Sequence, residues 1–202
     1  MSKLYAITDS TLMPGDKLIT GVRAALEGGC RLVQYRDKSG DAVKRKREAE
    51  ALLLLCQEYR AQLIINDDPR LAHETGAHGV HMGQWDGDAA EARRLLGPGA
   101  LLGITCHDSL YFAEKAVADG ASYIAFGRFF PSRTKPEAPP APLDLISSAK
   151  ARFPDIPLVA IGGINLENAS EVIRSGADFV AVSHALFGAP DIEAQARAFS
   201  AL

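Results

Sequence analysis

The stretch A-F-G-R-F-F-P-S-R-T-K, from Ala125 to Lys135, joins an apolar run to a loop of hydroxyls and cations. The aromatic and β-branched residues at 123–126 are typical of a short buried strand. Gly127 permits a sharp exit from that strand, and the prolines that follow stiffen the loop. The pattern predicts a strand that presents an anion-binding loop, because hydroxyls and an ammonium can each bind a phosphate oxygen. A solvated surface loop is the alternative for this stretch taken alone.

Seven further apolar runs of similar length occur along the chain, and together they predict strands at 3–8, 31–35, 62–65, 79–82, 101–105, 123–126, 158–161 and 179–182. Residues spaced as on helices lie between the runs, for example at 41–59, 89–96 and 109–119. Asp68 followed by Pro69 is typical of a helix N-cap and first turn. The chain therefore reads as eight β-α units.

Eight alternating units with short connections predict a parallel sheet, and a (β/α)8 barrel, or TIM barrel, closes eight strands without leaving an edge. An open doubly wound sheet is the alternative, but it gathers its functional residues at one switch point. In this chain polar residues follow seven different strands, namely Gln34, Asn66, Asp86, His107, Ser132, Gly163 and Ser183. We therefore predict a single barrel domain over residues 1–202.

The composition is that of an ordinary globular protein, with 202 residues and a net charge of −3. Such a charge supplies no basic field for nucleic acid or for an anionic membrane. The chain has neither a signal-peptide pattern nor an apolar run long enough to cross a bilayer, so we expect a cytoplasmic protein without membrane or nucleic-acid partners. Its three widely spaced cysteines are expected to be small buried residues. Assembly into a homo-oligomer is compatible with this composition.

The segment Q-Y-R-D-K, residues 34–38, presents two cations at the end of a strand. In an extended chain Gln34, Arg36 and Lys38 share one face, while Tyr35 and Asp37 lie on the other. If the first face points into the barrel mouth, the two cations are partly desolvated and need an anionic partner. That partner is either an acidic side chain or a ligand such as a diphosphate. The alternative is a structural pairing with nearby carboxylates.

Carboxylates follow two successive strands, at Asp67 and Asp86. Asp68 is expected to be occupied as the N-cap before Pro69, which leaves Asp67 free to face the mouth. Two carboxylates plus water suit Mg²⁺, which takes its remaining ligands from substrate phosphates. Each aspartate alone is more often a cap than a ligand, but together, beside several cations, they predict a magnesium site.

Two further features concern anion binding and histidine. Gly162-Gly163 and Ser183-His184 follow the seventh and eighth strands, the usual phosphate-binding corner of such barrels. His78 and His81 lie three positions apart on a strand, face opposite ways, and are expected to be structural.

With these motifs in order, the chain resembles the thiamine phosphate synthase family from Leu4 to Phe187. The motifs that carry the resemblance are Q-Y-R-D-K at Gln34, I-N-D-D at Ile65, G-V-H-M-G-Q-W-D at Gly79, G-I-T-C-H at Gly103, S-R-T-K at Ser132 and A-I-G-G-I at Ala160. The resemblance implies a (β/α)8 barrel that joins hydroxymethylpyrimidine diphosphate to a thiazole phosphate, or its carboxylated form. The implied products are thiamine phosphate and diphosphate, formed by a dissociative substitution.

The resemblance also implies roles for individual residues. The pyrimidine diphosphate would be held by Gln34, Tyr35, Arg36, Asp37, Lys38, Asn66, Thr105 and Lys135. The thiazole phosphate would be held by Ser132, Thr134 and Gly163, with Arg133 and Ser183 as further substrate-binding residues. Arg36, Lys38 and Lys135 would stabilise the leaving diphosphate, and Asp67 and Asp86 would bind Mg²⁺.

Some positions depart from the common family pattern, among them Trp85, Arg128 and the Ser183-His184 pair. A related branch of the fold isomerises the thiazole and is similar in using a histidine where this chain has Arg128. Arginine is protonated throughout the working pH range and cannot act as a general base there, which disfavours a thiazole tautomerase. A non-catalytic barrel that binds a phosphate ligand is the third alternative, but it has no need of the two carboxylates.

Overall fold

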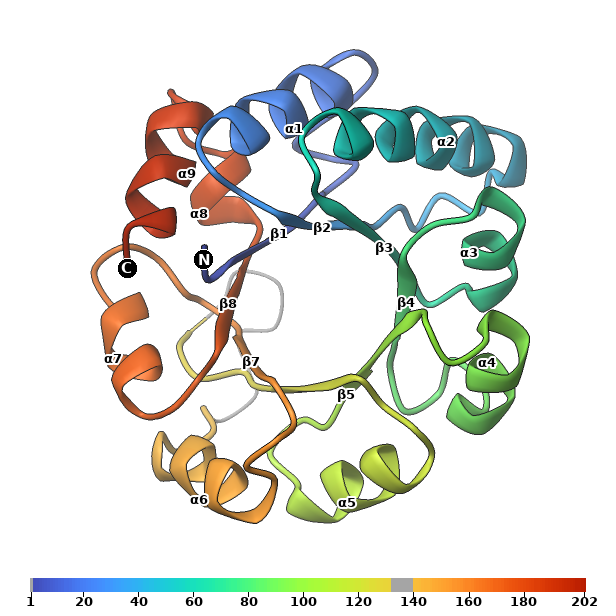
Figure 1. Ribbon diagram of the computed structural model, residues 1–202. Helices are drawn as coiled ribbons and strands as arrows, with labels where there is room; N and C mark the ends of the chain where they lie inside the picture. Colours follow the sequence, from blue (N-terminus) through green and yellow to red (C-terminus); the bar gives the residue numbers. More distant parts are fainter. Residues whose placement is uncertain (1, 132–139) are drawn as a thin grey trace.

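The structure, a computed structural model, describes residues 2–131 and 140–202. Its strands form a closed parallel barrel in chain order (Figure 1). The strands are β1 (Leu4–Ile7), β2 (Leu32–Tyr35), β3 (Gln62–Asn66), β4 (Gly79–Met82), β5 (Leu101–Thr105), β6 (Tyr123–Phe126), β7 (Leu158–Ile161) and β8 (Phe179–Val182). The predicted (β/α)8 barrel is confirmed, and the open-sheet alternative is excluded.

Pairing between the first and last strands closes the barrel. Leu4 lies beside Val180 and Ala6 beside Val182, in parallel register. All neighbouring strands pair in the same parallel sense. Because every strand runs the same way, the loops after the strands meet at one rim, where such barrels carry their active sites.

Helices surround the barrel (Figure 1). They are α1 (Lys17–Glu27), α2 (Ala42–Glu58), α3 (Pro69–Thr75), α4 (Ala89–Leu96), α5 (Leu110–Ala118), α6 (Asp144–Arg152), α7 (Ala169–Arg174), α8 (His184–Phe187) and α9 (Ile192–Ser200). Most agree with the helical spacing in the sequence, but α8 was not predicted. Among the described residues, no helix is both long and apolar enough to cross a membrane.

Apolar side chains form two separate cores. The smaller core fills the barrel and consists of Tyr5, Ile7, Leu32, Ile64, Tyr123, Ala125, Val159 and Ala181. The larger core lies between the strands and the helices, and it includes the three buried cysteines. On α2 the inward stripe is Ala49, Leu52, Leu55 and Cys56. Val43 is 80% exposed, because a helix turns by about 100° per residue and so places Val43 on the face opposite Leu52.

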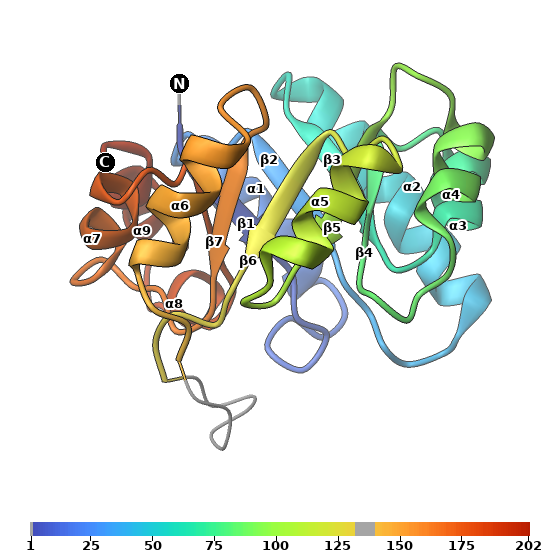
Figure 2. The same cartoon turned by 90° about the horizontal axis from the view of Figure 1, so that it is seen from below.

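The carboxyl ends of the strands lie at the lower edge of the molecule in Figure 2, with the loops that follow β2 and β4. The first turns of the helices begin from this rim. The side chain of Asp68 accepts a 2.9 Å hydrogen bond from the N–H of Leu71, and Pro69 occupies the first turn of α3. This confirms the predicted N-cap and removes Asp68 from the residues that face the mouth.

Gly103 in β5 makes room for an aromatic ring inside the barrel. A Cβ at this position would lie 2.0 Å from Cζ of Tyr123, so no side chain fits unless the ring moves. Tyr123 is 5% exposed and packs edge-on against Tyr5, with ring centroids 5.9 Å apart. The glycine therefore serves the packing of the barrel interior.

Gly103→Ala should destabilise the protein by about 1–3 kcal/mol, because an overpacked core forces side chains out of their preferred positions. Denaturant unfolding followed by circular dichroism would measure the loss. Gly99→Ala is the matched control, since a Cβ there meets no atom within 4 Å. Equal stability of the two variants would contradict the assigned role of Gly103.

Candidate active site

The side chains at the end of β2 and in the loop after it point to two sides and have different partners. Nε2 of Gln34 donates a 2.8 Å hydrogen bond to the hydroxyl of Tyr5 inside the barrel. On the opposite face, the Tyr35 hydroxyl donates to Oε2 of Glu48 at 2.6 Å, and Oδ2 of Asp37 lies 2.5 Å from Nζ of Lys44. These contacts agree with the predicted alternation at Gln34, Tyr35 and Asp37, and the side chains of Tyr35 and Asp37 are turned towards α2 rather than the mouth.

Two cationic residues, Arg36 and Lys38, follow in the loop after β2. The N–H of Arg36 donates a 2.9 Å hydrogen bond to the hydroxyl of Thr8, which follows β1. Thr8 in turn donates its own N–H to the carbonyl of Gln34, so the β1–β2 pairing continues past the strand ends. The ammonium of Lys38 pairs with Oδ2 of Asp67, in the loop after β3. The cations are thus carried by backbone that the barrel itself fixes.

Asp67 and Asp86 are neighbours, as predicted from their positions after adjacent strands. Burial raises the pKa of Asp86, and the hydrogen-bonded carboxyl of Asp67 raises it further. Asp86 also accepts a 2.7 Å hydrogen bond from the N–H of Gly83, which fixes its loop. Two adjacent carboxylates repel each other unless a proton or a cation lies between them.

The backbone at Asp67 has a left-handed conformation, with φ of 64°. Its N–H donates a 2.7 Å hydrogen bond to the carbonyl of His81, at the end of β4. Aspartate tolerates this conformation better than most residues, yet such positions are uncommon and cluster at functional sites. The strand end at Asn66 and the turn at Asp67 are therefore held in a specific geometry at the mouth.

A chain of hydrogen-bonded side chains crosses the barrel interior below this mouth. The hydroxyls of Tyr5 and Tyr123 lie 2.7 Å apart, and Tyr123 lies 3.1 Å from Nδ1 of His81. Nε2 of His81 is 2.9 Å from the hydroxyl of Thr105. With Gln34 at the other end, the chain connects two of the predicted substrate-binding residues across the barrel. It holds the amide and the hydroxyl in fixed orientations.

His81 is uncharged in this network. Burial lowers its pKa to about 4, although Asp67 acts in the opposite direction. One ring nitrogen of the neutral imidazole therefore donates and the other accepts. His78 has a different partner, because its Nδ1 accepts a 3.0 Å hydrogen bond from the N–H of Leu63. The prediction that the two histidines are structural and do not share a ligand agrees with these contacts.

The glycine pair after β7 adopts the positive φ angles that only glycine accommodates readily, 101° at Gly162 and 66° at Gly163. A Cβ on Gly163 would lie 2.4 Å from the carbonyl oxygen of Pro131, so this glycine also permits close packing of the loop after β6. Among the described residues, no hydrogen bond engages the N–H of Gly163. A turn follows the glycine pair, in which the N–H of Asn165 donates to Oδ1 of Asn168, and helix α7 starts at Ala169.

Some predicted site residues lie outside the described part of the chain: Ser132, Arg133, Thr134 and Lys135. Ser183 is partly buried and is the N-cap residue of α8, where its carbonyl accepts hydrogen bonds from Leu186 and Phe187. Within residues 2–131 and 140–202, no group of three or more His, Cys, Asp or Glu side chains is arranged to hold a metal ion.

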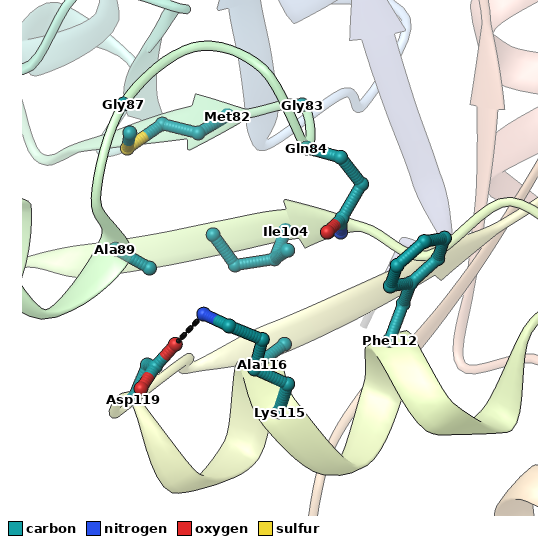
Figure 3. Close-up of a pocket in the computed structure, with 10 residues that line it drawn as sticks. All are labelled: Met82, Gly83, Gln84, Gly87, Ala89, Ile104, Phe112, Lys115, Ala116 and Asp119. Carbon is teal, nitrogen blue, oxygen red and sulfur yellow. Dashed lines mark hydrogen bonds and ion pairs between the residues drawn. The ribbon is translucent and has the colours of Figure 1, made fainter.

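A small cavity lies outside the barrel, between the loop after β4, strand β5 and helix α5 (Figure 3). Its volume is about 40 Å³, which suits a few waters and not a phosphorylated heterocycle. Gln84 at its edge donates a 2.6 Å hydrogen bond to the carbonyl of Thr105, and Lys115 pairs with Asp119. Its lining residues do not include Lys38, Asp67 or Asp86.

Sequence reasoning missed the residues that line the barrel interior. Tyr5, Tyr123 and His81 occupy inward positions of strands and were expected to be apolar packing or structural groups. A signal existed, because a buried tyrosine hydroxyl needs a polar partner. That partner cannot be identified from the sequence, since it comes from a strand far away along the chain.

The fold and the mouth define a class: a (β/α)8-barrel protein with cations, paired carboxylates and a glycine corner at the carboxyl ends of its strands. The family described as thiamine monophosphate synthase matches residues 4–186. A thiamine-phosphate synthase of Marinobacter nauticus is 56% identical over 199 residues, covering 98% of this chain and 89% of that protein. The chain belongs to the thiamine monophosphate synthase family, and the predicted kind of enzyme is confirmed.

Solved structures agree with this assignment. Thiamine phosphate pyrophosphorylase from Pyrococcus furiosus superposes with a TM-score of 0.88 at 34% identity, covering 98% of this chain and 93% of that one. Orotidine 5'-phosphate decarboxylase from Pyrococcus horikoshii superposes with a TM-score of 0.68 at 14% identity, over 96% of this chain and 97% of its own. The second likeness concerns the barrel fold alone.

The lowered pKa of His81 predicts a loss of stability in acid. Because the unfolded chain takes up a proton near pH 6.5 and the folded chain only near pH 4, the free energy of unfolding should fall as the pH drops through this window. The full effect is roughly 3 kcal/mol. His81→Gln should flatten the pH dependence of unfolding in metal-free buffer, although its stability at pH 7 will be lower.

The matched control is His73→Gln, which changes an exposed histidine on α3. That variant should keep the slope of the wild-type protein between pH 4 and 7. An unchanged slope in His81→Gln would show that this histidine does not cause the acid sensitivity.

Proposed function

We propose that this protein is a magnesium-dependent thiamine phosphate synthase. It couples 4-amino-2-methyl-5-(diphosphooxymethyl)pyrimidine with 4-methyl-5-(2-phosphoethyl)thiazole to give thiamine phosphate and diphosphate. If the thiazole arrives in its carboxylated form, CO2 is released as a further product. The observation that carries the proposal is the meeting of Asp67, Asp86 and Lys38 at one mouth, beside the backbone that carries Arg36. Cations and a carboxylate pair together suit a metal-bound diphosphate.

Asp67 and Asp86 are the residues that would hold the magnesium ion. Their oxygens suit a hard cation that keeps several waters and accepts phosphate oxygens as further ligands. The raised pKa of Asp86 comes first from burial and then from the nearby Asp67, and a cation between the two carboxyls would relieve the second of these causes. When bound, the ion would neutralise part of the charge on the diphosphate.

The proposed reaction begins when the bond between the pyrimidine methylene carbon and the diphosphate oxygen breaks. Its electron pair leaves with the diphosphate, and Arg36 and Lys38 stabilise the growing negative charge. Lys135, which lies outside the described residues, would be a third cation. The lone pair of the thiazole nitrogen then forms the new bond to the methylene carbon. No side chain has to act as a nucleophile in this scheme.

Holding both substrates supplies proximity for the second step. Gln34, Asn66 and Thr105 would hold the pyrimidine, and the hydrogen-bonded chain through Tyr5 and His81 keeps two of them oriented. The thiazole phosphate would bind at the corner formed by Gly163 and Ser183, together with Ser132, Arg133 and Thr134. Among residues 2–131 and 140–202 the N–H of Gly163 has no hydrogen-bond partner, and this N–H, in a left-handed backbone, supports an anion contact there.

One assay tests the proposed function. The purified protein is incubated with Mg²⁺ and both phosphorylated heterocycles, and thiamine phosphate and pyrophosphate are measured. Formation of both products in equal amounts, abolished by a chelator, is expected. Conversion of the thiazole without coupling would favour the tautomerase, and binding without turnover would favour a non-catalytic barrel.

Substitution of Asp67 and Asp86 tests their proposed role as magnesium ligands. Asp67→Asn or Asp86→Asn should lower turnover at fixed Mg²⁺ by at least about tenfold, equivalent to roughly 1.4 kcal/mol, because the metal loses a charged ligand. Asp68→Asn is the control, since asparagine preserves the N-cap of α3 and the residue does not face the mouth. Magnesium titrations of the rate would measure all three. If they coincide, the metal ligands are elsewhere.

Arg36→Lys should lower turnover by at least about tenfold, because lysine keeps the charge but loses the paired N–H donors that grip a phosphate. The leaving diphosphate gains charge in the transition state, so the loss should appear in kcat as well as in KM. Steady-state kinetics with the pyrimidine diphosphate as the varied substrate would measure it. Wild-type kinetics in this variant would mean that Arg36 is structural.

A further inference from the structure

Helix α2 anchors the end of β2 and the loop that follows it, through side chains that point away from the barrel interior. Nζ of Lys44 lies 2.5 Å from Oδ2 of Asp37, and Oδ1 of the same carboxylate accepts a 2.6 Å hydrogen bond from the N–H of Ser39. One helical turn further, Glu48 accepts the hydroxyl of Tyr35 at 2.6 Å. Two side chains of the loop segment are therefore anchored to one face of α2.

These anchors leave no room for a ligand of their own. The cavity among Tyr35, Asp37, Lys44 and Glu48 has a volume of about 20 Å³. The side chain of Asp37 is 1% exposed, and that of Lys44 is 32% exposed. The pair is therefore part of the packed structure and not a second binding site.

The pair stays charged at any working pH. Burial alone would raise the pKa of Asp37, but the ammonium of Lys44 and the N–H of Ser39 outweigh it and hold the pKa at about 2. A buried carboxylate left without its cation is strongly unfavourable. Removing the ammonium would therefore push Asp37 towards solvent and displace the backbone on either side of it.

The backbone on either side carries Arg36 and Lys38. Because side chains alternate along an extended chain, a rotation that turns Asp37 outwards also turns its two neighbours away from the mouth. We propose that Lys44 is a positioning residue for the reaction, which fixes Arg36 and Lys38 towards the diphosphate through Asp37. The inference rests on the proposed function, since it needs a diphosphate bound by these two cations.

Lys44→Met keeps most of the packing of the side chain and removes the ammonium. KM for the pyrimidine diphosphate should rise by about tenfold or more, because small displacements of a binding group have large effects. KM for the thiazole phosphate should stay within about twofold, since its site lies on the opposite side of the mouth. Lys44→Arg should restore most of the affinity, because it returns the cation to Asp37.

Lys150→Met is the matched control. Lys150 pairs with Asp178 at 2.9 Å and is 34% exposed, so it resembles Lys44 in both respects. Its partner precedes β8, at the end of the barrel away from the mouth. Its carboxylate partner, Asp178, is 37% exposed, so this variant should lose less thermal stability than Lys44→Met, and both KM values should stay at the wild-type level.

Calorimetry with magnesium pyrophosphate separates this inference from the proposed function. The wild-type protein should bind it, and Lys44→Met should bind it about tenfold more weakly. If the wild type forms no thiamine phosphate but the two affinities differ in this way, the proposed function fails and the positioning role stands. Equal affinities, absence of binding by the wild type, or equal increases in both KM values would overturn the inference.

Discussion

The hydrogen-bonded pairing of β1 with β8 closes the sheet, and the site depends on this closure. It places Leu4 beside Val180, although the two residues lie near opposite ends of the chain. Once all strands are parallel and closed, the segments after them share one rim, so Thr8 can accept the N–H of Arg36 and Lys38 can reach Asp67. The same closure packs Tyr5 against Tyr123 across the interior, which requires a glycine at position 103.

The alternation of side chains along an extended chain divides residues 34–38 between two tasks. One face carries Gln34 into the barrel and Lys38 to Asp67, and the other carries Tyr35 and Asp37 to helix α2. Because the same backbone carries both sets of side chains, a movement of one set also moves the other. A ligand-binding side chain on a loop is held as precisely as one on a strand when the residues next to it are anchored, as Tyr35 and Asp37 are anchored to α2.

The electrostatics of the mouth follow from charges held in fixed positions. Asp67 and Asp86 come from loops after adjacent strands, and burial, together with the nearby carboxyl of Asp67, raises the pKa of Asp86. Lys38 partly offsets that repulsion. Below this charged rim the network of Tyr5, Tyr123 and His81 is neutral, because burial disfavours any charge there. The protein thus separates a charged region suited to diphosphate from a neutral polar interior.

The sequence by itself determined the eight β-α units, most strand bounds, the N-cap at Asp68 and the two faces of residues 34–38. These features depend on local rules: strand periodicity, capping chemistry and the conformational limits of proline and glycine. Contacts between distant segments were decided only by the tertiary structure. Examples are the anchoring of Asp37 by Lys44, the hydrogen-bonded chain through His81, and the packing of Gly163 against Pro131. Which side chains meet across a barrel depends on strand register and closure, and no local pattern encodes either.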